Sequence, residues 1–572
     1  MAIDSLNPLI VQSDQTLLLD VHAGRAEEAR AAILPFAELE KSPEHIHTYR
    51  ITPLSLWNAA SAGFTPADVL RVLNEYTRYP IPQGISEGFG DIMARYGKIR
   101  LVAGTQDDLL LTACDEAILA EIWAAKALEK YLVKYVKDEV QGFALKLIER
   151  GSVKRELIRL GWPVQDEAPF VPGEAHEISL RESCASGLSF VLRDYQMEAA
   201  AAVLGDGGPG TGYGVVVLPC GSGKTIVGML IMSMLKTNTL ILTTNVAAVH
   251  QWMDELLDKT SLKSDEIAEY TGDSKSTAPV TIATYQILTW RPDKTSDFPH
   301  FKLFRERPWG LIIYDEVHLL PAPVFRVTAE LQAVRRLGLT GTLVREDGEE
   351  AAVFSLVGPK RYDVPWKDLE GKGWIAGAFC TEIRIDLSEK LKLPYAVASL
   401  REKYRIASEN PLKNEAVLQL IENHQDDQIL VIGQYINQLE NLARLLKQPL
   451  ITGKTPNSER ERIYAAFKKG EVRVIVVSKV ANFAIDLPDA SMAVQVSGSF
   501  GSRQEEAQRL GRILRPKERN SLFYTLVSRY TVEENFAANR QKFLAEQGYK
   551  YTIQHWNAVT APGSPEGARV VI

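Results

Sequence analysis

The sequence of 572 residues has only four cysteines and no long apolar run. The cysteines lie far apart without a Cys-x-x-Cys pair, which argues against a disulfide framework and against a zinc or iron–sulfur cluster of local spacing. No run of about 18 apolar residues occurs, so no membrane-spanning helix is predicted. The start of the chain also lacks the basic residues and apolar stretch of a signal peptide. We therefore expect a cytoplasmic protein with reduced thiols and no membrane contact.

Internal repeats of fixed period and long low-complexity tracts are absent as well, which excludes solenoid and disordered classes. The 45% of hydrophobic and 24% of charged residues are typical of a folded protein, and the length suggests three to four domains of about 150 residues. The net charge of −7 is unevenly placed, because residues 1–185 hold 19 Lys and Arg against 27 Asp and Glu, whereas the remainder holds 46 against 45. A nucleic-acid partner is therefore not excluded.

Short apolar runs alternate with helical patterns in the second half of the chain. They are bounded by turn residues, as buried parallel strands are, and they occur at 215–218, 240–242, 280–283, 311–314, 429–432, 474–477 and 493–496. This order predicts two doubly wound α/β domains in tandem. Upstream, helical patterns among shorter apolar runs predict an α+β region, with helices at 52–60, 65–76, 115–140 and 153–160.

A phosphate loop is predicted directly after the run 215–218. Residues 219–225 read Pro-Cys-Gly-Ser-Gly-Lys-Thr, and a helical pattern follows. Glycines let backbone N–H groups approach phosphate oxygens, and the amino end of the next helix favours negative charge. Lys224 would contact the β and γ phosphates and Thr225 would hold Mg²⁺, whereas a purely structural glycine turn is the alternative. The candidate nucleotide-binding residues are Cys220, Gly221, Ser222, Gly223, Lys224 and Thr225.

Two carboxylates follow the run 311–314. Asp315 can hold hydrated Mg²⁺, and Glu316 can polarise the attacking water, because both stand at the carboxyl end of a predicted strand beside the phosphate loop. Further along, Arg512 and Arg515 are three residues apart and share one face if the segment is helical. Such a pair can neutralise charge on a transferring γ-phosphoryl group. A solvated acidic turn and a solvated basic helix are the respective alternatives.

Together these motifs resemble those of superfamily 2 helicases. In detail they resemble the xeroderma pigmentosum group B (XPB) type of DNA repair helicase in its prokaryotic form, over about four-fifths of the chain. The triplet Arg345-Glu346-Asp347 is the most specific part, because it is similar to a motif tied in that family to DNA unwinding. The other segments that carry the resemblance are 192–196 (Leu-Arg-Asp-Tyr-Gln), 218–225, 315–318 (Asp-Glu-Val-His), 337–347, 478–480, 486–488 and 503–512.

The resemblance implies a domain order. It comprises two tandem RecA-like helicase domains with doubly wound parallel sheets, preceded by an α+β region. The predicted segments are an N-terminal module at 1–105, a damage-recognition-like region at 106–188, an ATP-binding RecA-like domain at 189–376, a second RecA-like domain at 377–550 and a tail at 551–572.

The resemblance also implies ATP and Mg²⁺ as cofactors, DNA as the partner and 3′-to-5′ translocation. Gln196 is similar in position to the family's adenine reader. Hydroxyls at predicted strand ends suit contacts with a nucleic-acid backbone, and the residues concerned are Thr243, Thr284, Thr452 and Ser478. Archaeal members of the family work with a nuclease, which suggests a nuclease partner.

Two basic stretches have alternative interpretations. Lys126, Lys130, Lys134 and Lys137 would share one face of the predicted helix 115–140, either as a DNA-facing stripe or as a solvated face. A DNA-clamping thumb, if present, must lie within about 387–410, where a solvated charged helix is the alternative.

We therefore predict an ATP-dependent DNA helicase, an enzyme of DNA repair. Three alternatives stay open: a duplex-DNA translocase that opens DNA only locally or drives a partner nuclease, a structural subunit with a dispensable ATPase, and an RNA helicase. The presence of Lys224, Asp315, Glu316, Arg512 and Arg515 disfavours the structural subunit, because a purely structural role requires none of them.

Overall fold

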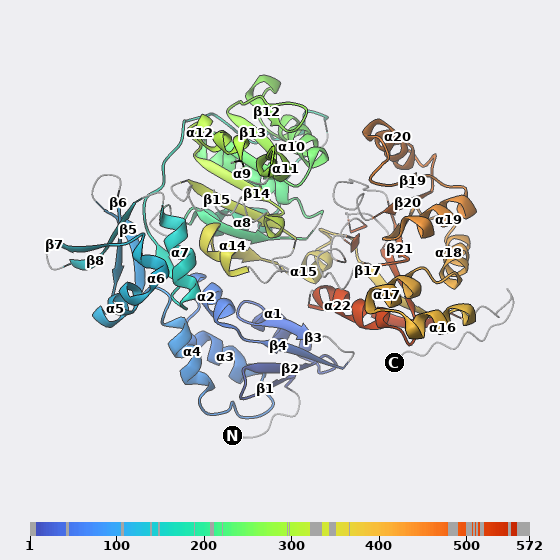
Figure 1. Ribbon diagram of the computed structural model, residues 1–572, viewed down its shortest axis with the longest axis horizontal. Helices are drawn as coiled ribbons and strands as arrows, with labels where there is room; N and C mark the ends of the chain where they lie inside the picture. Colours follow the sequence, from blue (N-terminus) through green and yellow to red (C-terminus); the bar gives the residue numbers. More distant parts are fainter. Residues whose placement is uncertain are drawn as a thin grey trace. The chain divides into compact units, whose positions relative to one another are not determined.

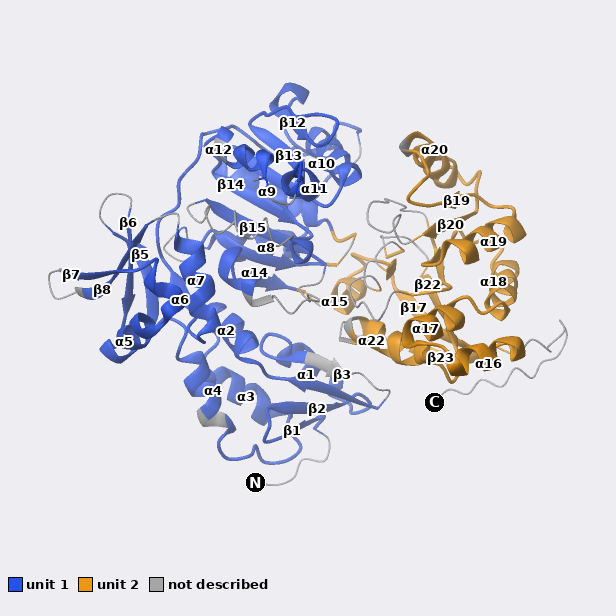
Figure 2. Ribbon diagram, viewed as in Figure 1, with its two compact units in different colours: residues 1–218, 223–363 blue, residues 219–222, 364–572 orange. Residues whose placement is uncertain are grey.

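The computed structural model of this protein divides into two compact units (Figure 2). Unit 1 comprises residues 1–218 and 223–363, and unit 2 comprises residues 219–222 and 364–572. The residues that the structure describes are 7–41, 45–104, 108–137, 140–146, 149–187, 189–205, 207, 211–219, 221–293, 296, 298–320, 334–341, 350–364, 366–478, 490–498, 506, 509–510, 513–514, 520–546, 549 and 551–556.

Unit 1 begins with an antiparallel sheet and four helices. Both predicted helices of this part are confirmed. They begin where they do because Thr52 and Thr65 form capping boxes and a proline follows each of them at the first helical position. The sheet has the strand order β1-β2-β4-β3. The elements are β1 (Leu9–Val11), β2 (Thr16–Asp20), α1 (Ala26–Ile33), β3 (Glu38–Lys41), β4 (Ile46–Arg50), α2 (Pro53–Ser61), α3 (Pro66–Tyr76) and α4 (Ile85–Met93) (Figure 1).

A second sheet follows in unit 1, with the order β7-β8-β6-β5-β9 among its described strands. The boundary predicted at residue 105 stays a prediction, and it falls between β5 and β6, which pair antiparallel. The elements are β5 (Ile99–Ala103), β6 (Asp108–Ala113), α5 (Glu116–Ala124), α6 (Lys126–Glu129), β7 (Val133–Lys137), β8 (Val140–Lys146), α7 (Arg150–Arg159) and β9 (Val164–Asp166).

The single helix predicted at 115–140 is wrong. The chain leaves the helix at Ala125, whose backbone is extended, and Val133–Lys137 pairs antiparallel with Val140–Lys146. Valine and tyrosine at 133–136 favour a strand, and this tertiary pairing outweighs the helical periodicity of the lysines. Because Lys126 lies in α6 and Lys134 in β7, the four lysines do not form a stripe along one helix.

The first parallel sheet also belongs to unit 1 and has the order β12-β13-β11-β14-β15-β10-β16 among its described strands. All pairings are parallel. The four predicted strands are confirmed as β10, β11, β13 and β14. The elements are α8 (Asp194–Leu204), β10 (Tyr213–Val217), α9 (Lys224–Leu235), β11 (Thr239–Thr243), α10 (Val246–Lys259), β12 (Ile267–Tyr270), β13 (Val280–Thr284), α11 (Tyr285–Thr289), α12 (Leu303–Glu306), β14 (Leu311–Asp315), β15 (Arg335–Thr340), α14 (Glu350–Leu356) and β16 (Lys360–Asp363).

Unit 2 contains the second parallel sheet, with the order β19-β20-β18-β21-β22-β17-β23 among the strands described there. The predicted runs are β18, β20 and β21, so the predicted α/β class with two parallel-sheet domains is confirmed. The elements are α15 (Trp366–Gly371), β17 (Ala378–Ile385), α16 (Glu389–Val397), α17 (Leu400–Ser408), α18 (Leu412–Asn423), β18 (Ile429–Gly433), α19 (Ile436–Leu446), β19 (Leu450–Ile451), α20 (Asn457–Lys468), β20 (Val474–Ser478), β21 (Met492–Gln495), β22 (Ser521–Ser528), α22 (Val532–Glu546) and β23 (Tyr551–Trp556).

In the part of the chain that the structure describes, no helix combines the length and the apolar character needed to cross a lipid bilayer. The predicted boundaries at 188, 376 and 550 stay predictions.

A buried ion cluster joins the second sheet of unit 1 to strand β10. Arg150 donates to both carboxylate oxygens of Asp166, at 3.1 and 2.7 Å, and Lys154 donates to the same group at 2.7 Å. The Tyr213 hydroxyl of β10 donates to the Asp166 carbonyl at 3.3 Å. Burial alone would raise the pKa of Asp166, but the charges of Lys154 and Arg150 hold it well below its usual range. Burial lowers the pKa of Lys154 to about 8.

We predict that Asp166→Asn destabilises unit 1 by about 3–5 kcal/mol, because it leaves two buried cations without their counter-charge. The free energy of unfolding from urea titrations measures this loss. Asp254→Asn, on the exposed side of α10, serves as the control and should change the free energy by less than about 0.5 kcal/mol. Equal effects of the two substitutions would contradict the role of the cluster.

Candidate active site

The phosphate loop leaves the carboxyl end of β10 and leads into α9, as the sequence predicts. Gly221 and Gly223 have φ angles of +80° and +84°, a region that other residues rarely adopt. The Ser222 side chain is buried and donates to the Pro219 carbonyl at 2.7 Å, which closes a turn. Helix α9 begins at Lys224, so its amino end, which favours negative charge, lies next to the loop. The loop therefore has the backbone form that phosphate binding needs.

Gln196 of α8 lies against this loop. A Cβ atom added to Gly223 would be 2.7 Å from the Gln196 Nε2 atom, so the side chain packs directly on the glycine. Gln196 is buried, and its Oε1 atom accepts a hydrogen bond from the Arg193 backbone at 3.0 Å. The structure thus brings the predicted adenine reader next to the predicted phosphate loop.

The acidic pair stands at the end of β14 and faces the loop lysine. Lys224 Nζ lies 3.1 Å from Glu316 Oε1, across 92 positions of sequence. Glu316 has a φ of +49°, a strained conformation for a residue with a side chain. The strand end therefore turns sharply, and the turn brings Glu316 to the amino end of α9.

Asp315 is held by two donors. Its Oδ1 atom accepts from the Glu316 backbone at 3.0 Å, and its Oδ2 atom accepts from Trp252 Nε1 at 2.9 Å. Burial and the negative charge of Glu316 raise the pKa of Asp315 to about 6, against the opposing influence of Lys224 and Trp252. Two carboxylates thus compete for one ammonium group. Their oxygen atoms and the nearby Thr225 hydroxyl are the donor types that Mg²⁺ prefers, so the residues present fit that ion.

Sequence reasoning missed Trp252 and Tyr285 of this site and gave no role to His318, which it placed in the Asp-Glu-Val-His motif. Trp252 of α10 bonds the Asp315 carboxylate, and the Tyr285 hydroxyl donates to the Asp315 carbonyl at 2.9 Å. His318 is buried, with Nδ1 2.6 Å from Thr340 Oγ1 and 3.4 Å from Glu316 Oε2. The sequence signal for Trp252 and Tyr285 is weak, because buried aromatic residues in helices of α/β proteins most often serve packing.

The predicted backbone-contacting hydroxyls lie at strand ends, as expected. In unit 1, Thr243 and Thr284 end β11 and β13, and Thr284 Oγ1 also accepts from the Ile287 backbone to cap α11. In unit 2, Ser478 ends β20, and Thr452 directly follows β19. Their contacts with nucleic acid stay predictions.

Several predicted site residues lie outside the described part of the chain. They are Cys220 of the phosphate loop, the triplet Arg345, Glu346 and Asp347, and the pair Arg512 and Arg515. Their predicted roles stay predictions.

The described residues define a class of protein. A glycine turn at the amino end of a helix, a lysine, and two carboxylates at the end of another strand of the same sheet are the groups typical of a nucleoside triphosphate hydrolase of the phosphate-loop type.

Family models and relatives specify this class further. The model described as ERCC3/RAD25/XPB C-terminal helicase matches residues 369–561, the model of the type III restriction enzyme, res subunit, matches 189–345, and the model of the helicase conserved C-terminal domain matches 9–137.

Relatives match over nearly the whole chain. A Kineococcus radiotolerans protein named DNA 3'-5' helicase XPB is 53% identical, over 96% of each chain. A Mycobacterium tuberculosis protein of the same name is 51% identical, over 97% of this chain and 99% of that one. An Enterocytozoon bieneusi protein, named general transcription and DNA repair factor IIH helicase/translocase subunit XPB, is 33% identical, over 95% and 92%. The chain therefore belongs to the XPB family of helicases, as its motifs predict, and it is an ATP-dependent helicase.

We predict that Trp252→Phe lowers the kcat of ATP hydrolysis about tenfold. The substitution removes the N–H group that orients Asp315, and a hydrogen bond to a charged group contributes about 1.5–3 kcal/mol. Steady-state phosphate release measures kcat. Trp290→Phe is the matched control, because Trp290 is 51% exposed and its indole contacts His300 rather than the acidic pair. A Trp252→Phe variant as active as this control would contradict the role of Trp252.

Proposed function

We propose that this protein couples ATP hydrolysis to the 3′-to-5′ unwinding of DNA, and that it does so in DNA repair. The contact of Lys224 with Glu316, next to the half-buried Asp315, is the observation that best supports the proposal, because side chains suited to binding phosphate, holding a metal ion and polarising water lie close together there. The relatives at 51% and 53% identity are named DNA 3'-5' helicases, which supports DNA as the substrate and 3′-to-5′ as the direction of unwinding.

The described residues suggest a division of work during hydrolysis. When ATP binds, Lys224 leaves Glu316 and contacts the β and γ phosphate oxygens instead. Glu316 can then accept a proton from the attacking water. Thr225 and Asp315 would hold Mg²⁺, which when bound neutralises charge on the phosphate oxygens. Trp252 keeps the Asp315 carboxylate oriented, and Gln196 reads the adenine edge through its amide.

The remaining roles rest on the motifs. Arg512 and Arg515 neutralise charge that develops on the γ-phosphoryl group, and loss of that group alters the grip on a DNA strand once per ATP. Thr243, Thr284, Thr452 and Ser478 contact the DNA backbone, and Arg345, Glu346 and Asp347 separate the strands. Contacts of this kind read the backbone rather than the base sequence.

A duplex-DNA translocase that opens DNA locally is the second candidate function. It is favoured by the names of the eukaryotic relatives, such as the Saccharomyces cerevisiae protein called a helicase/translocase subunit, which is 30% identical over 95% of this chain. Under this alternative the same ATP site drives the motor, and a partner such as a nuclease completes the activity.

We predict that Lys224→Ala abolishes ATP hydrolysis and DNA unwinding while the protein stays folded, because the phosphates lose their main cation. Phosphate release with and without DNA measures hydrolysis, and circular dichroism checks the fold. Lys236→Ala is the matched control, since this lysine lies at the opposite end of the same helix and pairs with the exposed Glu177. Hydrolysis at the wild-type rate in Lys224→Ala would remove the phosphate-loop assignment.

We also predict that joint replacement of Arg345, Glu346 and Asp347 by alanine reduces strand separation more than DNA-stimulated ATP hydrolysis. The triplet is proposed to act on the DNA junction and not on ATP, so the two activities should separate. Both are measured on the same preparation with the same forked DNA. Equal losses in hydrolysis and in strand separation would argue against a separate unwinding role.

A further inference from the structure

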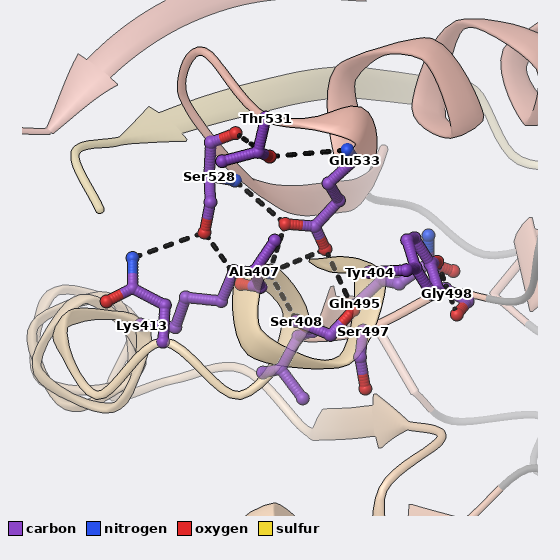
Figure 3. A network of polar contacts seen from close by, with 12 residues as sticks. Tyr404, Ala407, Ser408, Lys413, Gln495, Ser497, Gly498, Ser528, Thr531 and Glu533 are labelled. Carbon is purple, nitrogen blue, oxygen red and sulfur yellow. Dashed lines mark hydrogen bonds and ion pairs between the residues drawn. The ribbon is translucent and has the colours of Figure 1, made fainter. Parts of the chain in front are cut away.

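A chain of buried polar contacts runs through unit 2, outside the groups that the mechanism uses. Figure 3 shows its central part, where side chains of α17, α18 and α22 converge on the ends of β21 and β22. The eight side chains that form the contacts described below are almost fully buried. They are Tyr404, Lys413, Gln495, Glu506, Arg509, Ser528, Glu533 and Arg540.

One branch of this network fixes α22 against α18. Lys413 Nζ donates to both carboxylate oxygens of Glu533, at 2.7 and 2.9 Å, and to the Val496 carbonyl at 3.0 Å. The Ser528 backbone donates to Glu533 at 2.9 Å, and the Ser528 hydroxyl donates to the Ala407 carbonyl at 2.7 Å. The hydrogen bonds named here join α17, α18 and α22 to the ends of β21 and β22, and none of these bonds involves residues 506–514.

A second branch leads from α17 toward that segment. The Tyr404 hydroxyl donates to the Gly498 carbonyl at 2.7 Å and accepts from Arg540 Nη1 at 3.2 Å. Arg540 of α22 also forms an ion pair with Glu506, with Nε 3.4 Å from Oε2. Gly498 leaves room for this arginine, because a Cβ atom there would lie only 2.3 Å from the Arg540 Cζ atom. Tyr404 and Arg540 thus connect two helices to the backbone after β21 and to Glu506.

From Glu506 the branch continues along the segment itself. Gln495 Nε2 donates to Glu506 at 2.9 Å, and Arg509 donates to the Gln495 Oε1 atom. Arg509 is followed three residues later by Arg512. The Tyr404–Arg540 branch thus holds two buried side chains, Glu506 and Arg509, that precede Arg512 by six and three positions in the sequence.

Buried charges of this kind are sensitive to the loss of one partner. An ion in a dry interior is stabilised only when its partners are in place, so the network has one well-defined arrangement. A group that acts on a transition state must be held to within a fraction of an ångström, and misplacement by about 1 Å costs up to about a hundredfold in rate. A network that fixes Glu506 and Arg509 is suited to that task.

We propose that Tyr404 and Arg540 are positioning residues for the arginine segment of unit 2. They act through Glu506 and Arg509 on the placement of Arg512, and the proposal rests on the role given to the arginine pair under the proposed function. Because the arginines act on the transition state, loss of positioning lowers kcat and leaves the KM for ATP unchanged.

The test compares two substitutions in the full chain that each delete one buried hydroxyl. Tyr404→Phe removes the donor to Gly498, and Ser528→Ala removes the donor to Ala407, which belongs to the other branch. Both should lower the melting temperature by a similar number of degrees. Only Tyr404→Phe should lower the kcat of DNA-stimulated ATP hydrolysis, by about tenfold, with KM for ATP changed by less than about twofold. Equal kcat values for the two variants would overturn the proposal.

A double-mutant cycle with Arg512→Ala separates this proposal from the proposed function. If Tyr404 acts through Arg512, Tyr404→Phe should have almost no further effect on kcat in the Arg512→Ala background. If Arg512→Ala leaves kcat unchanged, the assignment of the arginine pair fails. If Arg512→Ala lowers kcat but the effects of the two substitutions multiply, the arginine assignment stands and the positioning role is overturned.

Discussion

The parallel hydrogen bonding of β10, β14 and β15 is the constraint on which the site depends. Strand β14 pairs with β15 up to Asp315, and β10 pairs with β15 up to Val217. The carboxyl ends of all strands in a parallel sheet lie at the same edge, so Lys224 and Glu316, which are 92 positions apart in the sequence, meet there. The strands are buried on both faces, and burial of their apolar side chains at about 25 cal/mol per Å² holds this edge in place.

At this edge of the sheet, two negative carboxylates lie close to a single positive lysine side chain. Asp315 and Glu316 share one lysine, and the pKa of Asp315 is raised to about 6 as a result of burial and of the neighbouring charge. The two buried ion clusters described above are balanced differently: Asp166 faces two cations, and Glu533 is held by Lys413 and by the Ser528 backbone N–H. The first arrangement suits a site that binds a cation and phosphates, whereas the others suit permanent packing.

The sequence allowed the strands and the phosphate loop to be predicted because both have local signatures. Apolar runs bounded by turn residues marked β10, β11, β13 and β14, and threonine followed by proline marked two helix starts. The helix predicted at 115–140 failed because the pairing of β7 with β8 outweighs helical spacing. Trp252 and Tyr285 could not be found, since their contacts with Asp315 span 63 and 30 positions and depend on the sheet order. The buried network around Arg540 has no local signature for the same reason.

The central claim is that this ATP site drives strand separation in one direction. Its most direct test is strand displacement with ATP and Mg²⁺ on two duplexes of identical sequence, one with a 3′ single-stranded tail and one with a 5′ tail. The account predicts displacement from the 3′-tailed duplex only. Displacement from the 5′-tailed duplex only, or hydrolysis stimulated by DNA without displacement of either strand, would contradict it.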